Sequence, residues 1–220
     1  MSRELKDALY GQFARIGHAV ASPKRLELLD LLSQGEKDVE TLATQSAMPV
    51  KNTSAHLRVL RQARLVESRR EGTYVHYRLA DDSVVQLLHA LQHLGQKRLA
   101  EVEQVTQLYF TSRDELEPVT LQDLRRLMRD GDVTVIDVRP RDEYEAGHIP
   151  GALSLPLAEL KGRAPRLPKS KEVIAYCRGA YCVYSLEAVR LLRKRGYRAR
   201  RAQEGLPEWR ASNMPVAVGS

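Results

Sequence analysis

The sequence predicts two domains of different fold class: a mainly helical domain with a β-hairpin, then an α/β domain with a mostly parallel sheet. In the first half, apolar residues recur with helical spacing, and two strand-like runs then flank a glycine. In the second half, short apolar runs alternate with helical segments, as in parallel sheets. The chain has 220 residues. That length suffices for two cores, since domains commonly have about 100–150 residues.

Two helices are expected at the start of the chain. Apolar residues spaced by three and four predict helices over residues 5–20 and 23–32. Ser22 supplies an N-cap for the second helix, and Pro23 is a favoured first helical residue. Gly35 marks the end of that helix.

A helix pair with helix-turn-helix proportions follows. Residues 39–45 form a short third helix, and Pro49 opens a fourth that we expect to direct Val50, Leu57 and Leu60 inward. The connection between the two helices is only residues 46–48, which is typical of a helix-turn-helix.

The polar residues of the fourth helix suit DNA recognition. Lysine and arginine pair with phosphate or guanine, asparagine pairs with adenine, and an α-helix fits the major groove. Residues 65–70 and 73–79 are predicted as two strands joined at Glu71-Gly72, a hairpin with a basic tip. Helix-turn-helix and hairpin together make a winged helix that binds double-stranded operator DNA. The predicted contacts are Lys51, Asn52, Ser54, His56, Arg58, Arg61, Arg69 and Arg70.

Charge favours the same location. The formal net charge is +7, and the basic residues gather over residues 51–78 and again over residues 190–201. Clustering indicates a nucleic-acid surface better than net charge does. The second cluster is interpreted as the solvated face of a helix and the turn after it. An alternative for the first cluster is a small helical domain that its basic residues merely keep in solution.

The N-terminal half resembles the ArsR-type winged-helix repressors over roughly residues 5–108. The resemblance is carried by residues 54–60, 63–66, 69–72 and 74–77. It implies a homodimer that binds a palindromic operator and releases it when an inducer arrives. Many relatives sense metal through cysteines in the third helix, but residues 38–42 contain none. His89 and His93 are one turn apart, and one alternative is that they share a metal, but no matching ligand set surrounds them. We therefore predict no metal site and expect sensing elsewhere in the chain.

An apolar stripe over residues 81–109 independently favours a dimer. A small domain cannot bury the whole stripe, and pairing between two copies would cover it. The residues of the stripe are Val84, Leu87, Leu88, Leu91, Leu94, Leu99, Val102 and Val105.

The composition becomes polar through residues 111–115, and Pro118 follows. We therefore place the domain boundary between Ser112 and Arg113, giving domains 1–112 and 113–220. In the second domain, helices are predicted over residues 121–128, 141–146 and 185–195. Extended segments are predicted over residues 133–136, 153–155 and 173–176.

Both cysteines of the chain lie in the loop between the last of these strands and the helix after it. Ligands of parallel sheets lie beyond the carboxyl ends of the strands. Backbone N–H groups and the dipole at a helix N-terminus would lower the pKa of a thiol there, and Arg178 would add a fixed cation. The alternative is a small buried cysteine in an ordinary turn. The candidate site residues are Cys177, Arg178, Gly179, Ala180, Tyr181 and Cys182.

The second half resembles the rhodanese family over about residues 118–218. The matching motifs are residues 137–139, 143–144, 147–152, 205–209 and 214–216. The resemblance implies that Cys177 is the nucleophile that accepts sulfur and that residues 178–182 cradle its persulfide. It also implies mainly structural roles for Asp137, Arg139 and His148. Related phosphatases and arsenate reductases place a phosphate-binding arginine six positions after the cysteine. Val183 stands there, which favours sulfur chemistry.

We therefore predict a dimeric transcriptional regulator, a repressor, that handles or senses a sulfane sulfur donor through a Cys177 persulfide resolved by Cys182. One alternative is a sulfurtransferase enzyme that moves sulfur from thiosulfate or polysulfide to a thiol acceptor and carries an attached DNA-binding half. Another is a regulator whose second half is an idle binding module. No cofactor is predicted.

The predicted location is the cytoplasm, with no membrane partner. The sequence contains no run of about 20 consecutive apolar residues, and residues 1–6 lack the apolar core of a signal peptide. Because the cytoplasm is reducing, the two cysteines are expected to act in redox or sulfur chemistry and not as a permanent crosslink.

Overall fold

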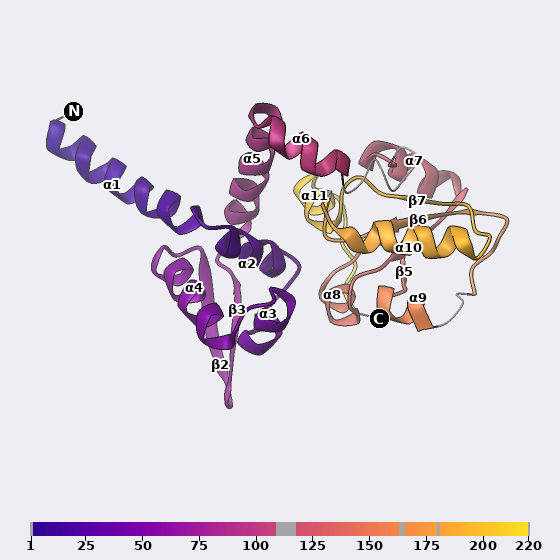
Figure 1. Cartoon of the computed structure of the whole chain (residues 1–220), viewed down its shortest axis with the longest axis horizontal. Coiled ribbons are helices and arrows are strands. Elements are labelled where there is room, and N and C mark those ends of the chain that lie inside the picture. Colours follow the sequence, from indigo (N-terminus) through magenta and orange to yellow (C-terminus); the bar gives the residue numbers. More distant parts are fainter. Residues whose placement is uncertain (1, 109–117, 163–165, 180, 220) are drawn as a thin grey trace. The chain divides into compact units, whose positions relative to one another are not determined.

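The computed structural model describes residues 2–108, 118–162, 166–179 and 181–219. The chain divides into two compact units, Met1–Leu94 and Gly95–Ser220, which we describe separately (Figure 1). The predicted domain boundary at residues 112 and 113 lies outside the described residues. Among the helices of the described ranges, none combines the length and apolar character needed to cross a membrane.

The first unit is a helical winged helix-turn-helix. Its three-stranded antiparallel sheet has the strand order β1-β3-β2. Helix α5 runs past the division between the units, and α6 follows it in the chain. From the start of the chain, the elements are α1 (Arg3–Val20), α2 (Pro23–Ser33), β1 (Lys37–Asp38), α3 (Val39–Gln45), α4 (Val50–Gln62), β2 (Val66–Glu71), β3 (Tyr74–Leu79), α5 (Asp82–Arg98) and, already within the second unit, α6 (Ala100–Thr106).

Local sequence signals account for the helix-turn-helix. Asp38 caps α3 by accepting a hydrogen bond from the Thr41 backbone N–H at 2.8 Å. Leu57 and Leu60 of α4 are fully buried in the core of this unit, as predicted. Val50 is 46% exposed, so the prediction that it points inward is wrong. It occupies the first helical position, directly after the N-cap residue Pro49, before the buried face of α4 begins.

The hairpin differs from the prediction at its turn. Strand β2 continues through Glu71, and Gly72, at φ +60, begins the turn in place of Glu71. A glycine adopts this left-handed conformation without steric cost. Strand β1, which the sequence analysis missed, pairs with β3 through Lys37 and Asp38.

The apolar stripe of residues 81–109 is interrupted. Helix α5 ends at Arg98, and Leu99 is extended at φ −114 and ψ 103 before α6 begins. Val84 and Leu88 are buried in the core, whereas Leu91, Leu94 and Leu99 are exposed. The end of the predicted stripe, residue 109, lies outside the described residues.

The second unit is an α/β domain with a four-stranded parallel sheet of order β5-β4-β6-β7. Together with the first unit, it confirms the predicted fold class. Three elements were missed: α9, β7 and α11. The elements are α7 (Leu121–Asp130), β4 (Val133–Asp137), α8 (Arg141–Ala146), β5 (Leu153–Ser154), α9 (Leu157–Gly162), β6 (Glu172–Tyr176), α10 (Val183–Lys194), β7 (Ala199–Arg201) and α11 (Leu206–Ala211).

Strand β6 is buried on both faces, which explains its continuous apolar sequence. Val173 and Ala175 belong to one core cluster, with Leu192 of α10. Ile174 and Tyr176 belong to a second cluster, with Trp209 of α11. This two-sided burial fixes β6 in the interior of the sheet and places residue 177 at its carboxyl edge.

The basic cluster at residues 190–201 was interpreted as a solvated face, but several of its arginines make contacts within the protein. Arg193 donates to the Ala199 carbonyl oxygen at 2.8 Å, and Arg200 pairs with Glu172 at 2.8 Å. Arg195 donates to the Leu160 carbonyl oxygen at 2.5 Å. These half-buried guanidinium groups fasten α10 and β7 to neighbouring segments.

Gly205 marks a close approach of two backbones, and we predict that Gly205→Ala destabilises the second unit. A Cβ at residue 205 would lie 2.3 Å from the Cys177 carbonyl oxygen and 2.5 Å from the Gly179 nitrogen. Overpacking of this kind costs about 1–3 kcal/mol in the free energy of unfolding. Urea unfolding measures it, with Gly162→Ala as control, because a Cβ there meets nothing within 4 Å. Equal midpoints for the two variants would contradict the prediction.

Candidate functional site

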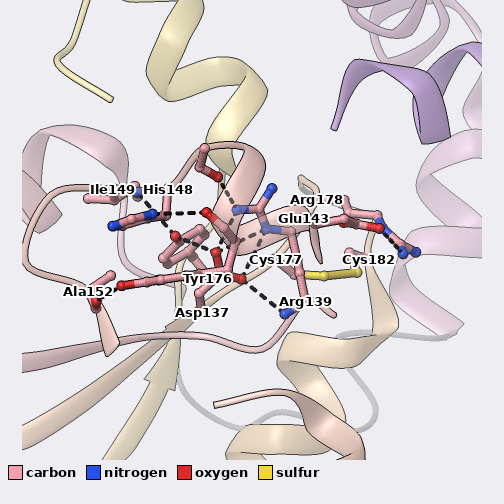
Figure 2. Close-up of polar contacts among 12 residues, drawn as sticks. Asp137, Arg139, Glu143, His148, Ile149, Ala152, Tyr176, Cys177, Arg178 and Cys182 are labelled. Carbon is pink, nitrogen blue, oxygen red and sulfur yellow. Dashed lines mark hydrogen bonds and ion pairs between the residues drawn. A yellow bond between two sulfur atoms is a disulfide. The ribbon is translucent and has the colours of Figure 1, made fainter. Parts of the chain in front are cut away.

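The two cysteines bracket the loop after β6. Cys177 directly follows the strand and is 2% exposed. Cys182 is the N-cap residue of α10. A disulfide joins the two sulfur atoms across a Cα–Cα distance of 6.1 Å (Figure 2). We expected the N-terminus of the following helix to lie beside Cys177. Cys182 is the residue that directly precedes α10, and the disulfide brings the Cys177 sulfur atom close to the start of that helix. Ala180 lies outside the described residues.

Arg178 is held beside the loop by a buried carboxylate. Its Nε donates to Glu143 Oε2 at 3.0 Å, and its Nη2 donates to Glu143 Oε1 at 2.6 Å (Figure 2). The Glu143 side chain is completely buried, and that of Arg178 is 12% exposed. The guanidinium also lies 5.3 Å from the centre of the Tyr184 ring. Arg178 is thus a fixed cation, as predicted, but Glu143 compensates its charge.

Helix α11 also lies close to the loop. Glu208 Oε2 accepts a hydrogen bond from the Gly205 N–H at 2.9 Å. The same carboxylate approaches Gly179 closely, since a Cβ there would lie 3.0 Å from Glu208 Oε1. Gly179 has φ +148, a conformation that favours glycine. Glu143 of α8 and Glu208 of α11 therefore contact or closely approach the first two residues after Cys177.

A second buried ion pair lies at the end of β4. Asp137 and Arg139 are both fully buried, and Arg139 Nη2 donates to Asp137 Oδ2 at 2.6 Å. The Tyr176 hydroxyl donates to the same oxygen at 2.5 Å and accepts from the Ile149 N–H at 3.1 Å (Figure 2). Burial, and then the charge of Asp137, raise the pKa of Tyr176, so its hydroxyl stays protonated. This network ties β4 to β6 directly beneath the cysteine loop.

His148 completes this region without reaching the sulfur atoms in the contacts that the structure describes. Its ring stacks on Tyr144 with centroids 3.7 Å apart, and its Nδ1 lies 2.9 Å from the Tyr144 carbonyl oxygen. The structural roles expected for Asp137, Arg139 and His148 agree with these contacts. Glu143, Tyr184 and Glu208 were not predicted as partners of the loop. Glu143 and Glu208 each lie within a matched motif, which was the one signal that pointed to them, whereas Tyr184 lies in none.

The second candidate site is the polar face of α4. Lys51, Ser54, Arg58 and Arg61 recur at helical spacing and form one stripe along the helix. The charged members and Asn52 are exposed, whereas Ser54 and His56 are half-buried. Arg61 Nη1 donates to the Ser68 hydroxyl at 3.2 Å, linking α4 to β2.

The wing arginines make contacts within the protein. Arg70 Nε donates to the Gly72 carbonyl oxygen at 3.1 Å, and Arg69 pairs with Glu36 and Glu71. Arg61, one of the six predicted residues of α4, therefore contacts the wing. Arg69, in the wing itself, is paired with carboxylates of the protein. Among the described residues, no three His, Cys, Asp or Glu side chains gather as a metal site requires.

In comparisons with known proteins, each half of the chain matches a different family. A family model described as "Bacterial regulatory protein, arsR family" matches residues 22–68, and one described as "Rhodanese-like domain" matches residues 120–212. The HTH-type transcriptional regulator Rv0324 of Mycobacterium tuberculosis is 43% identical over 98% of this chain and 94% of its own length. A sulfurtransferase of Allochromatium vinosum is 32% identical over 43% of this chain and 87% of its own length.

Solved structures include the homodimeric winged helix-turn-helix DNA-binding domain Mb0332 of Mycobacterium bovis. That domain is 43% identical, with a TM-score of 0.42, over 45% of this chain and 91% of its own. The match to Rv0324 spans both units, and the two family models fall one in each half. The chain therefore belongs to the ArsR family of bacterial transcriptional regulators, as a member that carries a rhodanese-like domain after its winged helix-turn-helix.

Proposed function

We propose that this regulator is a homodimeric repressor whose rhodanese-like domain senses reactive sulfur. One observation carries the proposal: the chain has two cysteines, and they form a disulfide within the loop at the carboxyl edge of the sheet, where the rhodanese resemblance implies a sulfur acceptor. A transcriptional regulator with its whole thiol content in that loop has a chemical input separate from its DNA-binding surface.

The chemistry proceeds in two balanced steps. In the reduced protein, the Cys177 thiolate attacks the sulfane sulfur of a polysulfide, the donor S–S bond breaks, and the shortened polysulfide leaves with the electron pair. Cys177 then carries a persulfide. The Cys182 thiolate attacks the Cys177 sulfur, forms the disulfide and expels the transferred sulfur as hydrosulfide. Both cysteines are oxidised and the sulfane sulfur is reduced. Two equivalents of a cellular thiol then restore the dithiol and leave joined as their own disulfide.

The DNA-binding half acts through its helix and wing. Residues Lys51, Asn52, Ser54, His56, Arg58 and Arg61 of α4 enter the major groove, and Arg69 and Arg70 of the wing contact phosphates. The reduced loop is compatible with tight operator binding. Sulfuration or disulfide formation changes the loop and lowers the affinity for the operator. The coupling is a free-energy difference between these two states.

Exposed apolar side chains on α1 and α5 support the homodimer. Tyr10 and Phe13 of α1 are 67% and 62% exposed, and Leu94 of α5 is 57% exposed. Large apolar side chains left exposed in this number are typical of association sites, and a second copy of the chain would cover them. Two-fold symmetry would then set the two recognition helices about one DNA turn apart.

The sulfurtransferase alternative is favoured by the likeness to the Allochromatium vinosum sulfurtransferase. Sustained transfer of sulfur from thiosulfate or polysulfide to a thiol would support an enzyme. A single transfer that ends in the disulfide would support a sensor. Failure of Cys177 to gain sulfur would favour the idle binding module.

We expect Cys177→Ser to bind operator DNA normally and to ignore polysulfide. The operator is first selected from random-sequence duplexes with the reduced protein. Polysulfide should weaken wild-type binding at least about fivefold, the lower end of allosteric coupling. In Cys182→Ser, intact-mass spectrometry should show one added sulfur that persists, because no thiol resolves the persulfide. Release of DNA by Cys177→Ser equal to that of wild type would remove Cys177 as the sensor.

We expect Arg58→Ala to weaken DNA binding and to reduce the slope of log affinity against log salt by about 1, as the loss of one phosphate contact does. Fluorescence anisotropy at several salt concentrations measures this slope. Lys171→Ala, which removes an exposed cation from the other unit, is the matched control. Identical slopes for the two variants would show that Arg58 does not contact DNA.

We expect Phe13→Glu to convert the dimer to a monomer, because the new carboxylate would be buried in the apolar interface. Size-exclusion chromatography with light scattering gives the mass. Val218→Glu, at a side chain that is 75% exposed near the C-terminus, is the control and should leave the mass unchanged. A Phe13→Glu protein that stays dimeric would place the interface away from this part of α1.

A further inference from the structure

The outer face of the wing sheet carries charged residues that face one another. Strands alternate their side chains, so Glu67, Arg69 and Glu71 of β2 share a face with His76 and Arg78 of β3. Glu67 lies opposite Arg78, and Arg69 lies opposite His76. The intervening residues Val66 and Tyr77 are buried in the core. This outer face therefore belongs to the wing surface that is available to DNA.

Two carboxylates hold Arg69. Its Nε and Nη2 donate to Glu36 Oε1 at 2.8 Å and 2.5 Å, and its Nη1 donates to Glu71 Oε2 at 2.5 Å. Glu36 precedes β1, whereas Glu71 ends β2, so carboxylates from two different segments of the chain bind the arginine. The hydrogen bond from Arg69, followed by the charge of that arginine, lowers the pKa of Glu71. Glu71 is therefore ionised throughout the physiological range.

His76 approaches the same two oxygens. Its Nδ1 lies 4.0 Å from Glu36 Oε1, and its Nε2 lies 3.9 Å from Glu71 Oε2. Asp38 of β1 lies opposite His76 on the other side of β3. The charged groups around the ring are thus Glu36, Asp38, Glu71 and Arg69, with the Glu67–Arg78 pair next along the face. The acidic groups outnumber the single arginine at the ring.

These contacts place a protein carboxylate where a DNA phosphate would bind. An arginine fork pairs with carboxylate and phosphate by the same geometry. The Arg69 side chain is 54% exposed, and exposed ion pairs are weak, so a phosphate can displace the carboxylates. Glu36 and Glu71 would still repel the incoming phosphate after the exchange. A protonated histidine beside them would compete for their oxygens and reduce that repulsion.

We propose that Glu36 and Glu71 occupy Arg69 in place of a DNA phosphate, and that protonation of His76 loosens their hold, so that DNA binding tightens as the pH falls. Histidine is the side chain suited to change charge near neutral pH, so the effect is sought between roughly pH 5 and pH 8. The inference rests on the proposed binding of DNA by the wing. It makes Glu36 a residue that sets DNA affinity without touching the DNA.

The test measures binding of the full-length protein to a mixed-sequence duplex by fluorescence anisotropy across that pH range. Phosphate contacts are independent of sequence, so no operator is needed. Glu36→Gln should tighten binding severalfold at high pH and flatten the pH dependence. Glu40→Gln, which removes an exposed carboxylate from α3, is the matched control for the change in net charge. His76→Gln should bind like wild type at high pH and fail to tighten at low pH.

A double-mutant cycle with Arg69→Gln isolates the contact. If Glu36 acts through Arg69, Glu36→Gln should change affinity in the Arg69→Gln background no more than Glu40→Gln does. An equal gain in both backgrounds would overturn the proposal, as would a His76→Gln protein that keeps the wild-type pH dependence. A wild-type protein that binds no duplex at any pH would instead contradict the proposed DNA binding. Thermal unfolding of each variant establishes that its fold is intact.

Discussion

The cysteine loop depends on a carboxylate sealed inside the second unit. Glu143 has no exposed side-chain surface, and an ionised carboxylate in that position requires a compensating partner. Arg178 supplies it with two hydrogen bonds and thereby fixes the residue next to Cys177. Loss of either partner would leave a buried charge. The pair therefore sets the geometry of the loop in which the two sulfur atoms meet.

In each unit, an arginine that we predicted to act on a ligand forms an ion pair with a carboxylate of the protein itself. Arg178 is compensated by a buried carboxylate, whereas Arg69 is held by exposed carboxylates on the wing. The difference in burial decides whether each arginine can exchange its carboxylate partner for another anion. An exposed pair exchanges readily with phosphate, but a pair with a buried partner resists separation. Arg178 thus fixes the loop, whereas the exposed pairs of Arg69 with Glu36 and Glu71 can exchange with another anion, as the proposed contact with DNA requires.

The sequence by itself determined the features that depend on neighbouring residues. The bounds of α3 and α8 agree with their predictions because apolar spacing and end signals are local. The wing, the parallel sheet and the position of the cysteine loop were also predictable. Each follows from a helix long enough to show its period or an apolar run long enough to mark a strand, and from the rule that ligands of a parallel sheet lie at the carboxyl ends of its strands.

Only the tertiary structure decided which distant residues meet. Strands β1 and β7 have two and three residues, too few to show a period, and they exist because β3 and β6 pair with them. Glu143 lies 35 residues from Arg178, and Glu36 lies 33 residues from Arg69. No local pattern links residues so far apart. Folding brings them together because burial and backbone pairing place their segments side by side, and charge compensation then selects the partners.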